Sequence, residues 1–341
     1  MTFLAVVVVG LGLLLLPFLP GFREIRKPKD DEPLRIDMNR TKDPRYFGRS
    51  FRALLNEARK GREKEYGIGL LKLSRPEEAE TAPSLSVAAR KKVARLLVVD
   101  GDFTAGAGSH FEKEIYAGGR AVVGDKAAFR ALAGDGDVIL GRKVKVLRWV
   151  DALGNIEAGE DSDLGLSVSG ERGLTLGRGC RFRRLYGHPV RTMAPDESPE
   201  ASPAPHGFPG PELGETAWVV DATRMIIPRA TEVSETLIVK TRLIVNARAV
   251  LRRDVKGYRD IALGKEVTVL GNIFAEGDVV IGPGARIAGN VFSQGRVRVG
   301  DGARIGRTGA EKSVVGNRGI ALGRGVEVYG SLSTEGDGTV S

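Results

Sequence analysis

The segment IGPGARIAGNVFSQGRVRVGDGARIG, residues Ile281–Gly306, contains nearly the same line twice, because VGDGARI follows IGPGARI after 18 residues. From Asp260 to Arg307 the chain divides into groups of six without a gap. The second and fourth residues of each group are apolar, with Ser293 as the one exception. Alternate apolar residues turn one face of a strand inward, and repeats of six residues are typical of β-helices. The segment therefore predicts an all-β fold, a parallel β-helix.

Three longer stretches align as successive coils of about 18 residues: Ile261–Gly277, Val279–Gly295 and Ile320–Gly336. Glycine near every sixth position would supply a positive φ at a corner. Each coil of such a solenoid buries its apolar side only against its neighbours. The same rhythm is looser in the earlier half of the chain. We therefore expect a first β-helix part over residues 96–190 and a second over 237–338, with Cys180 at an inward position.

A proline-rich stretch, APDESPEASPAPHGFPGPELGE (Ala194–Glu215), interrupts the repeats. Proline cannot donate to a ladder of hydrogen bonds. Residues 191–236 are therefore predicted to be an insert between the two β-helix parts. The insert is either a loop thrown out from one β-helix or a linker between two. Because strands resume immediately after it, we favour one continuous stack or two abutting stacks.

Composition limits the class of protein. The chain has 42% hydrophobic residues, 6% aromatic residues and 46 glycines, which favours many tight turns over a helix-rich enzyme core. One cysteine cannot form a disulfide framework. Much of the net charge of +9 lies in the N-terminal region. Uniformly basic nucleic-acid binding proteins are therefore disfavoured, and no nucleic-acid partner is predicted.

The first 22 residues, MTFLAVVVVGLGLLLLPFLPGF, carry no charged side chain. About 20 apolar residues span a bilayer core, so residues 1–22 are predicted to be a transmembrane anchor. A cleaved signal peptide is the main rival, although no basic residue precedes the apolar run; a buried core helix is a third alternative. The residues predicted to contact membrane lipid are Phe3, Leu4, Val7, Leu11, Leu14 and Phe18.

Basic residues follow the apolar run at once and would act as a topology signal; they are Arg23, Arg26, Lys27 and Lys29. Such residues stay in the cytoplasm. This predicts a single-pass protein of the inner (cytoplasmic) membrane whose body faces the cytoplasm.

Residues 23–95 are predicted to be a basic juxtamembrane region with helices. An apolar stripe at helical spacing comprises Phe51, Leu54, Leu55 and Ala58, and Ser50 precedes it as a candidate N-cap. This helix would lie either on the membrane surface or on one end of the β-helix. A second short helix is expected at about Ser86–Leu97.

Hexapeptide-repeat acyltransferases are the enzymatic alternative, because their repeats have a similar frame. Those enzymes use a histidine as general base. The histidines here are His110, His188 and His206, and none lies in the well-formed repeats. No phosphate-binding loop or dinucleotide fingerprint occurs either. No catalytic, cofactor-binding or metal-binding residue is therefore predicted.

The stretch VLGNIFAEGDVVIGPGARIAGNVFSQGRVRVGDGARIG (Val269–Gly306) resembles the bactofilins, polymer-forming cytoskeletal proteins of bacteria. The clear match covers Asp260–Gly336. The resemblance implies a right-handed β-helix that polymerises end to end without a nucleotide and often associates with the membrane.

These observations together predict a membrane-anchored, non-enzymatic scaffold that self-associates through its β-helix ends and needs no cofactor. Its partners would be further copies of itself and membrane lipid. The candidate polymer contacts are Val326, Val328, Tyr329 and Leu332. The C-terminal tail STEGDGTVS and the helix beginning at Ser50 are possible end caps. The alternatives are a closed acyltransferase-like trimer and a monomeric lateral adaptor for an unidentified protein.

Overall fold

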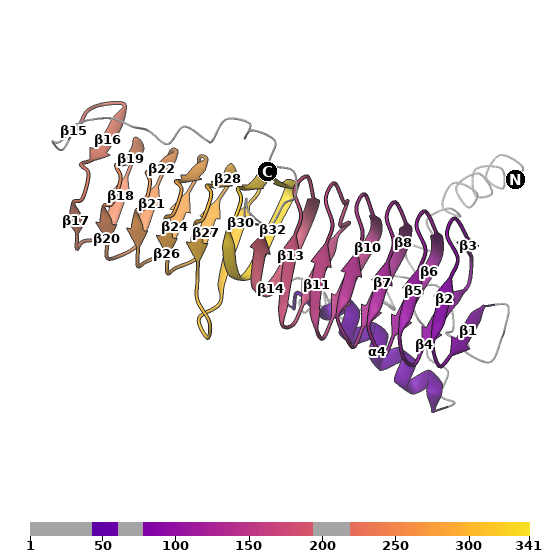
Figure 1. The fold of residues 1–341 in the computed structure, drawn as a ribbon. Helices are drawn as coiled ribbons and strands as arrows, with labels where there is room; N and C mark the ends of the chain where they lie inside the picture. Colours follow the sequence, from indigo (N-terminus) through magenta and orange to yellow (C-terminus); the bar gives the residue numbers. More distant parts are fainter. Residues whose placement is uncertain (1–42, 61–77, 194–218) are drawn as a thin grey trace, which may run out of the picture. The chain divides into compact units, whose positions relative to one another are not determined.

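Short strands separated by tight corners wind the chain into a parallel β-solenoid of about 13 turns with coils of about 18 residues (Figure 1). The computed structural model describes residues 43–60, 78–193 and 219–341. The predicted all-β solenoid fold is therefore confirmed. The solenoid consists of two stacks of coils, which we call the first stack (residues 78–193) and the second stack (residues 219–341).

The first stack has three rows of strands, one on each side of its coils. The first row contains the whole strands β1 (Ala79–Ala82), β4 (Leu96–Val99) and β12 (Ser167–Gly170). It also contains the second halves of β6 (His110–Ala117), β8 (Ala128–Gly134) and β10 (Lys145–Ala152), and part of β14 (Arg181–Thr192). The second row is β2 (Leu85–Val87), β5 (Phe103–Ala105), β7 (Ala121–Val123), β9 (Val138–Leu140), β11 (Asn155–Ala158), β13 (Gly173–Leu176) and the end of β14. The third row is β3 (Lys92–Val93) and the first halves of β6, β8 and β10.

The second stack repeats this arrangement. Its first row is β18 (Leu237–Val239), β21 (Val255–Gly257), β24 (Ile273–Ala275), β27 (Val291–Ser293) and β30 (Lys312–Gly316). Its second row is β16 (Arg224–Ile227), β19 (Arg242–Val245), β22 (Ile261–Leu263), β25 (Val279–Ile281), β28 (Arg296–Val299) and β31 (Gly319–Leu322). Its third row is β17 (Glu232–Val233), β20 (Val250–Leu251), β23 (Thr268–Val269), β26 (Arg286–Ile287) and β29 (Arg304–Ile305). The long β32 (Glu327–Val340) closes all three rows, and β15 (Val219–Val220) pairs with β16.

The 18-residue period of the sequence is the register of the ladders. Val279 lies opposite Ile261 on one side and opposite Val297 on the other. All three side chains are fully buried, and they belong to one apolar cluster that runs through both stacks. Cys180 belongs to the same cluster, which confirms its predicted inward position.

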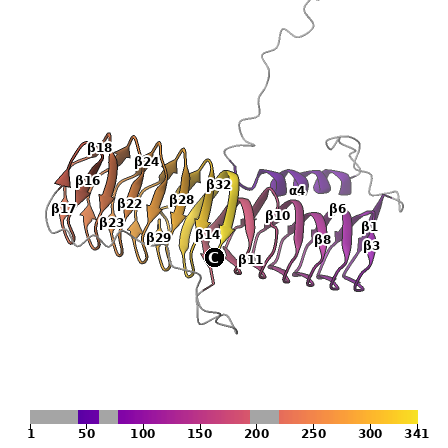
Figure 2. The same ribbon diagram turned by 90° about the horizontal axis from the view of Figure 1, so that it is seen from above.

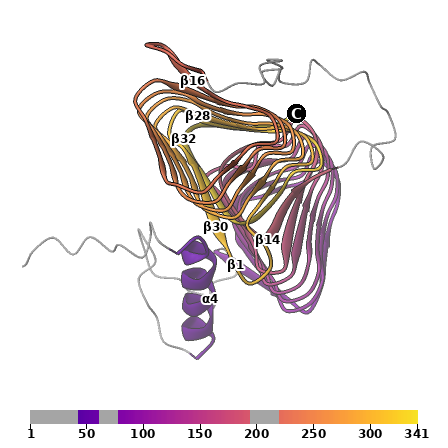
Figure 3. The ribbon, with the colours of Figure 1, turned by 90° about the vertical axis from the view of Figure 1, so that its left-hand side faces the viewer.

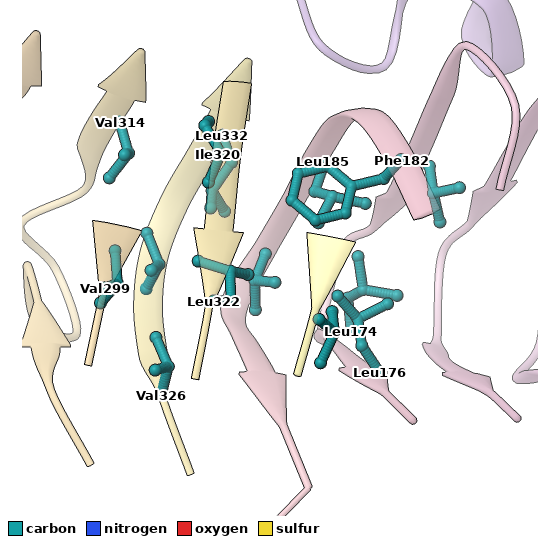
Figure 4. Packing of buried hydrophobic residues seen from close by; sticks show 14 of the residues in the cluster. Leu174, Leu176, Phe182, Leu185, Val299, Val314, Ile320, Leu322, Val326 and Leu332 are labelled. Carbon is teal, nitrogen blue, oxygen red and sulfur yellow. The ribbon is translucent and has the colours of Figure 1, made fainter. Parts of the chain in front are cut away.

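The two stacks run in opposite directions and meet at their C-terminal coils. Strand β14 ends the first stack and β32 ends the second, and these strands pair antiparallel (Figure 2). The fold is therefore two abutting stacks rather than one continuous stack. Apolar side chains from both last coils face this junction, among them Leu174 and Leu185 of the first stack and Leu322 and Leu332 of the second (Figure 4).

One corner of nearly every coil has a residue with positive φ, as the sequence predicted for glycine. Only some of these residues are glycines, such as Gly284 and Gly302; Lys143, Ala230 and Glu266 have the same conformation. Glycines at other corners have a different role. A Cβ atom on Gly300, for example, would lie 2.8 Å from the backbone nitrogen of Pro283 in the preceding coil. Glycine is required at those corners because the coils stack too closely to leave room for a Cβ atom.

Two predictions about the N-terminal part of the described chain are wrong. The segment Ser86–Leu97 is not a helix; it contains parts of β2 and β4 and all of β3, because its coil stacks on the next one. The strands accordingly begin at Ala79 rather than near residue 96. In the second stack they likewise begin before residue 237, at Val219.

The predicted amphipathic helix exists as α4 (Tyr46–Arg59), but Ser50 is not its N-cap. The helix begins one turn earlier, where Asp43 accepts a hydrogen bond from the backbone N–H of Arg45 (2.9 Å). The predicted stripe faces the protein: Phe51 and Leu55 are buried against the first stack. Figure 3 shows α4 beside the flank of the coils, not across an end. Docking on the β-helix is thus the correct alternative, although the site is a flank.

The predicted anchor and its basic topology signal, residues 1–22 and Arg23 to Lys29, lie outside the described residues, as does most of the proline-rich insert. Among the residues that are described, no helix is long and apolar enough to cross a membrane.

Candidate functional site: the ends of the two stacks

The outer end of the first stack is an open edge of the solenoid. Within the described residues, strands β1, β2 and β3 each pair on one side only, with β4, β5 and β6. No coil of the described chain covers the inward side chains here, and Leu85, Val87 and Val93 are only partly buried. An open recess of about 750 Å³ lies here. Unpaired backbone groups beside apolar side chains form a template for another strand edge.

Charge borders this open edge. Arg90 and Lys91 are exposed on the connection that precedes β3, and Lys92 pairs with Glu112 at 2.7 Å. Charged residues, especially lysine, are a common means of limiting uncontrolled pairing at strand edges. The edge is therefore apolar at its centre and basic at one corner, which would restrict the partners that can dock on it.

The outer end of the second stack is partly covered. Among the strands that the structure describes, β17 and β18 pair on one side only, with β20 and β21. The edge of β16, however, is covered by the short antiparallel strand β15. Asp221 organises the turn between β15 and β16, because it accepts hydrogen bonds from the backbone N–H groups of Thr223 and Arg224 (2.7 and 2.9 Å). The hydroxyl of Thr223 also donates to this carboxylate. This bond lowers the pKa of Asp221 most, and the two backbone bonds lower it further. The two outer ends therefore differ.

The inner ends meet within the chain, and this is where the structure places the four candidate polymer contacts. Val328 lies opposite Val190 and Leu332 opposite Leu185, in the antiparallel pairing of β14 with β32. Val326 is buried beside them and Tyr329 is half-buried in β32. The tail predicted as a cap is part of β32. The backbone partners of these residues are thus supplied by the same chain.

The helix α4 is fixed to the first stack by a buried cluster of charges that sequence reasoning missed. Arg45 is 3% exposed and donates to both carboxylate oxygens of Asp151, itself 1% exposed, at 2.9 and 3.0 Å. Arg52 also pairs with Asp151 and with Asp135. Ser169 donates to the same Asp151 carboxylate at 2.7 Å. Every charge that the helix buries is therefore compensated.

The electrostatics follow from this geometry. Burial alone would raise the pKa of Asp151, but the hydrogen bond from Arg45 and the charge of Arg52 outweigh burial and hold the pKa below its usual value. Burial opposes the charge of Arg45 as well, yet its bonds to Asp151 and Glu171 raise the pKa of the guanidinium. Arg45 and Asp151 are therefore both charged at neutral pH. The interactions of this cluster hold α4 on the first stack.

Spacing explains how the arginines find their partners. Arg45, Arg52 and Arg59 are seven residues apart, and they pair with Glu171, Asp135 and Asp100. Seven residues of helix rise about 10.5 Å, and two coils rise about 9.6 Å. The three acidic residues follow the strands of the first row in alternate coils. We call their position, directly after each first-row strand, the corner row. The seven-residue spacing was visible in the sequence, but its match to the coil spacing was not.

The two described histidines, which the acyltransferase alternative would need as a base, do not form one site. His110 is exposed on β6, and its acidic neighbours have other partners, Glu112 with Lys92 and Glu114 with Arg130 at 3.1 Å. His188 lies four coils away on β14, with Nε2 3.1 Å from Glu311. His206 lies outside the described residues.

Cys180 is fully buried, and burial raises the pKa of its thiol to about 11. Over the described ranges, no group of three or more His, Cys, Asp or Glu side chains is arranged to hold a metal ion.

Comparison of the chain with protein-family models, with curated proteins and with solved structures gave no match. The resemblance to bactofilins therefore remains a prediction from the repeats.

Proposed function

We propose that this protein is a non-enzymatic scaffold that self-associates through the outer ends of its stacks, without a nucleotide. The observation that carries the proposal is that β1, β2 and β3 pair on one side only with strands of the described chain. Because the inner ends are joined within the chain, growth would proceed through the outer ends. Residues 1–22 would anchor the assembly in the inner membrane, with its body in the cytoplasm. The bactofilin resemblance favours the same function.

The junction of the stacks supports the physical part of this proposal. There, two coil ends of this same sequence bury Leu185 and Leu332 against each other through antiparallel strand pairing. A contact between coil ends is therefore stereochemically accessible to these coils. The outer coil of the first stack has similar inward residues, such as Val87 and Val93, and strand edges that no described strand covers.

The test is electron microscopy and sedimentation of the full-length protein in detergent, without nucleotide or metal. The proposal predicts assemblies that grow with protein concentration and disappear in Val87→Asp, which places a charge on the open end. Leu166→Asp is the matched control, because Leu166 is 50% exposed away from the end. Circular dichroism would verify that both variants remain folded. Closed trimers, or assemblies that Val87→Asp leaves intact, would refute the proposal.

A further inference from the structure

The face of the first stack that α4 covers continues into the second stack. In the first stack the outward residues of the first row are in register: Val98, Tyr116, Ala133 and Asp151. All are buried beneath or beside the helix. The outward face of this row continues across the junction, where Arg184 of β14 lies opposite Ser333 of β32 and Ser333 lies opposite Val315 of β30. We call its continuation in the second stack the uncovered row: Val315, Phe292, Phe274, Lys256 and Ile238.

Four of the five residues of the uncovered row are apolar, and all five are at least partly exposed. Ile238 is 65% exposed and Phe274 is 44% exposed. The rings of Phe274 and Phe292 lie side by side, with centroids 6.4 Å apart. Leu270 and Tyr258 flank the row and are 46% and 39% exposed. Exposed apolar side chains gathered on one face are typical of an interaction surface. The described part of the chain offers no element that covers it.

The charges beside the uncovered row differ from those beneath α4. In the first stack the corner row is acidic at Asp100, Asp135 and Glu171. The same positions in the second stack, each directly after a first-row strand, are Lys240, Tyr258, Glu276, Gln294 and Asn317. Lys240 and Glu276 are two coils apart and opposite in sign.

The outer part of the uncovered row is also basic. Lys256 lies in the row itself, with its ammonium 5.1 Å from the ring of Tyr258. Arg253 and Arg259 are exposed beside it and form no ion pair with any described residue. The surface thus combines exposed cationic side chains on its outer coils with a pair of aromatic rings further in.

We propose that the uncovered row binds an amphipathic helix of a partner protein, in the manner in which α4 binds the first stack. The helix would be about 14 residues long, the length of α4. Its apolar stripe would cover Phe274 and Phe292. It would carry an acidic residue over Lys240 and, seven residues away, a basic residue over Glu276, because seven helical residues match two coils.

The α4 helix of a second copy does not fit this surface. Arg52 and Arg59 are seven residues apart and both are basic. Placed in the same register, Arg52 would pair with Glu276, but Arg59 would face Lys240. An exchange of α4 between copies is therefore disfavoured by like charges, and the surface selects a different helix. This binding does not depend on self-association through the outer ends.

The test uses the full-length protein and two fluorescent peptides with the sequence Asp43–Lys60. One peptide is unmodified; the other carries Arg45→Gln and Arg59→Glu, which gives the proposed charge pattern and retains Arg52. Fluorescence anisotropy would measure their binding to the wild type, to Phe274→Asp and to Lys240→Glu. Thermal unfolding would verify that the exposed substitutions leave the fold intact.

We expect the modified peptide to bind the wild type about fivefold more tightly than the unmodified one, the effect of replacing a repulsive pair by an attractive one. Lys240→Glu should reverse this preference, and Phe274→Asp should abolish binding of both peptides to this face. Equal affinities, or no binding dependent on Phe274 up to about 1 mM, would refute the proposal. Binding to vesicles of anionic phosphatidylglycerol that is lost in Phe274→Asp would also overturn it, because lipid would then be the occupant.

Discussion

Leu185 of β14 lies directly opposite Leu332 of β32, and this pair joins the C-terminal coils of two stacks that run in opposite directions. Each side chain is 1% exposed. The two residues are far apart in the sequence, and strands β15 to β31 of the second stack lie between them. One antiparallel strand pair thus determines which ends of the stacks are buried and which remain outside.

The register of this junction predicts a specific disulfide. Arg184 lies opposite Ser333, and directly opposed antiparallel residues have Cα atoms about 4.5–5.5 Å apart, which suits a disulfide. The double variant Arg184→Cys, Ser333→Cys should therefore form an intramolecular disulfide under mild oxidation, seen as faster migration in non-reducing electrophoresis. The control Arg184→Cys, Glu335→Cys is displaced by two residues and should cross-link much less. Exclusively intermolecular cross-links would contradict the junction.

The native cysteine should not interfere with that experiment. Burial raises the pKa of the Cys180 thiol to about 11, and the thiolate is the reactive form. At pH 8 only roughly one molecule in a thousand would carry the thiolate, against roughly a quarter for an ordinary thiol. Labelling with a maleimide should therefore be very slow in the native protein and fast in guanidinium chloride. Rapid native labelling would show that the coil around Cys180 opens readily.

The sequence predicted those parts of the fold that depend on neighbouring repeats better than those that depend on contacts between distant residues. The hexads from Asp260 to Arg307 predicted the coils correctly, because stacking in register is a local consequence of an 18-residue repeat. The segment Ser86–Leu97 was misread as a helix, because AARKKVARLL has helical propensity and its strand partners lie a coil away. Tertiary pairing overrode local preference there.

The candidate interaction surfaces were less accessible to sequence reasoning. The sequence did not indicate which strands lie at the outer ends, because it does not show that the two stacks run in opposite directions. Val326 and Leu332 are near the C-terminus of the sequence, yet they are buried at the junction between the stacks. The pairing of Arg45 with Asp151 joins residues 106 positions apart. The repeat pattern of the sequence does not indicate a contact over such a distance in the chain.

The corner residues predict opposite effects for two matched substitutions. Ala230 has φ 54°, and Gly302 has φ 66° with nothing within 4 Å of a Cβ atom added to it. The left-handed region is unfavourable for any residue with a Cβ. Ala230→Gly should therefore stabilise the protein by about 0.5–1 kcal/mol, and Gly302→Ala should destabilise it by about 1 kcal/mol. Urea denaturation monitored by circular dichroism would measure both changes.

Gly300 provides the contrasting case, because its constraint is the neighbouring coil. A Cβ atom there would lie 2.8 Å from the nitrogen of Pro283 and 2.9 Å from the carbonyl carbon of Gly282. Backbone cannot move aside as a flexible side chain can, so Gly300→Ala should cost about 1–3 kcal/mol, as overpacking does. The result would be contradicted if Gly300→Ala proved no more destabilising than Gly302→Ala.

The buried carboxylate of Asp151 predicts a pH-dependent loss of stability. Asp151→Asn removes the negative charge that compensates Arg45 and Arg52, and breaking a buried ion pair in this way costs about 3–5 kcal/mol. Asp163→Asn is the control, because Asp163 pairs with Arg181 at 3.5 Å on the surface and such pairs contribute about 0–1 kcal/mol.

The sign of the pH dependence follows from the lowered pKa of Asp151 in the folded protein. A carboxyl group with a lowered folded-state pKa contributes its full stability above the unfolded-state value, about 3.9. This contribution is lost as the pH falls through the folded-state pKa. The difference in urea midpoint between the wild type and Asp151→Asn should therefore be constant near neutral pH and shrink below about pH 4. A difference that grew on acidification would mean that Asp151 is not the ionised partner of α4.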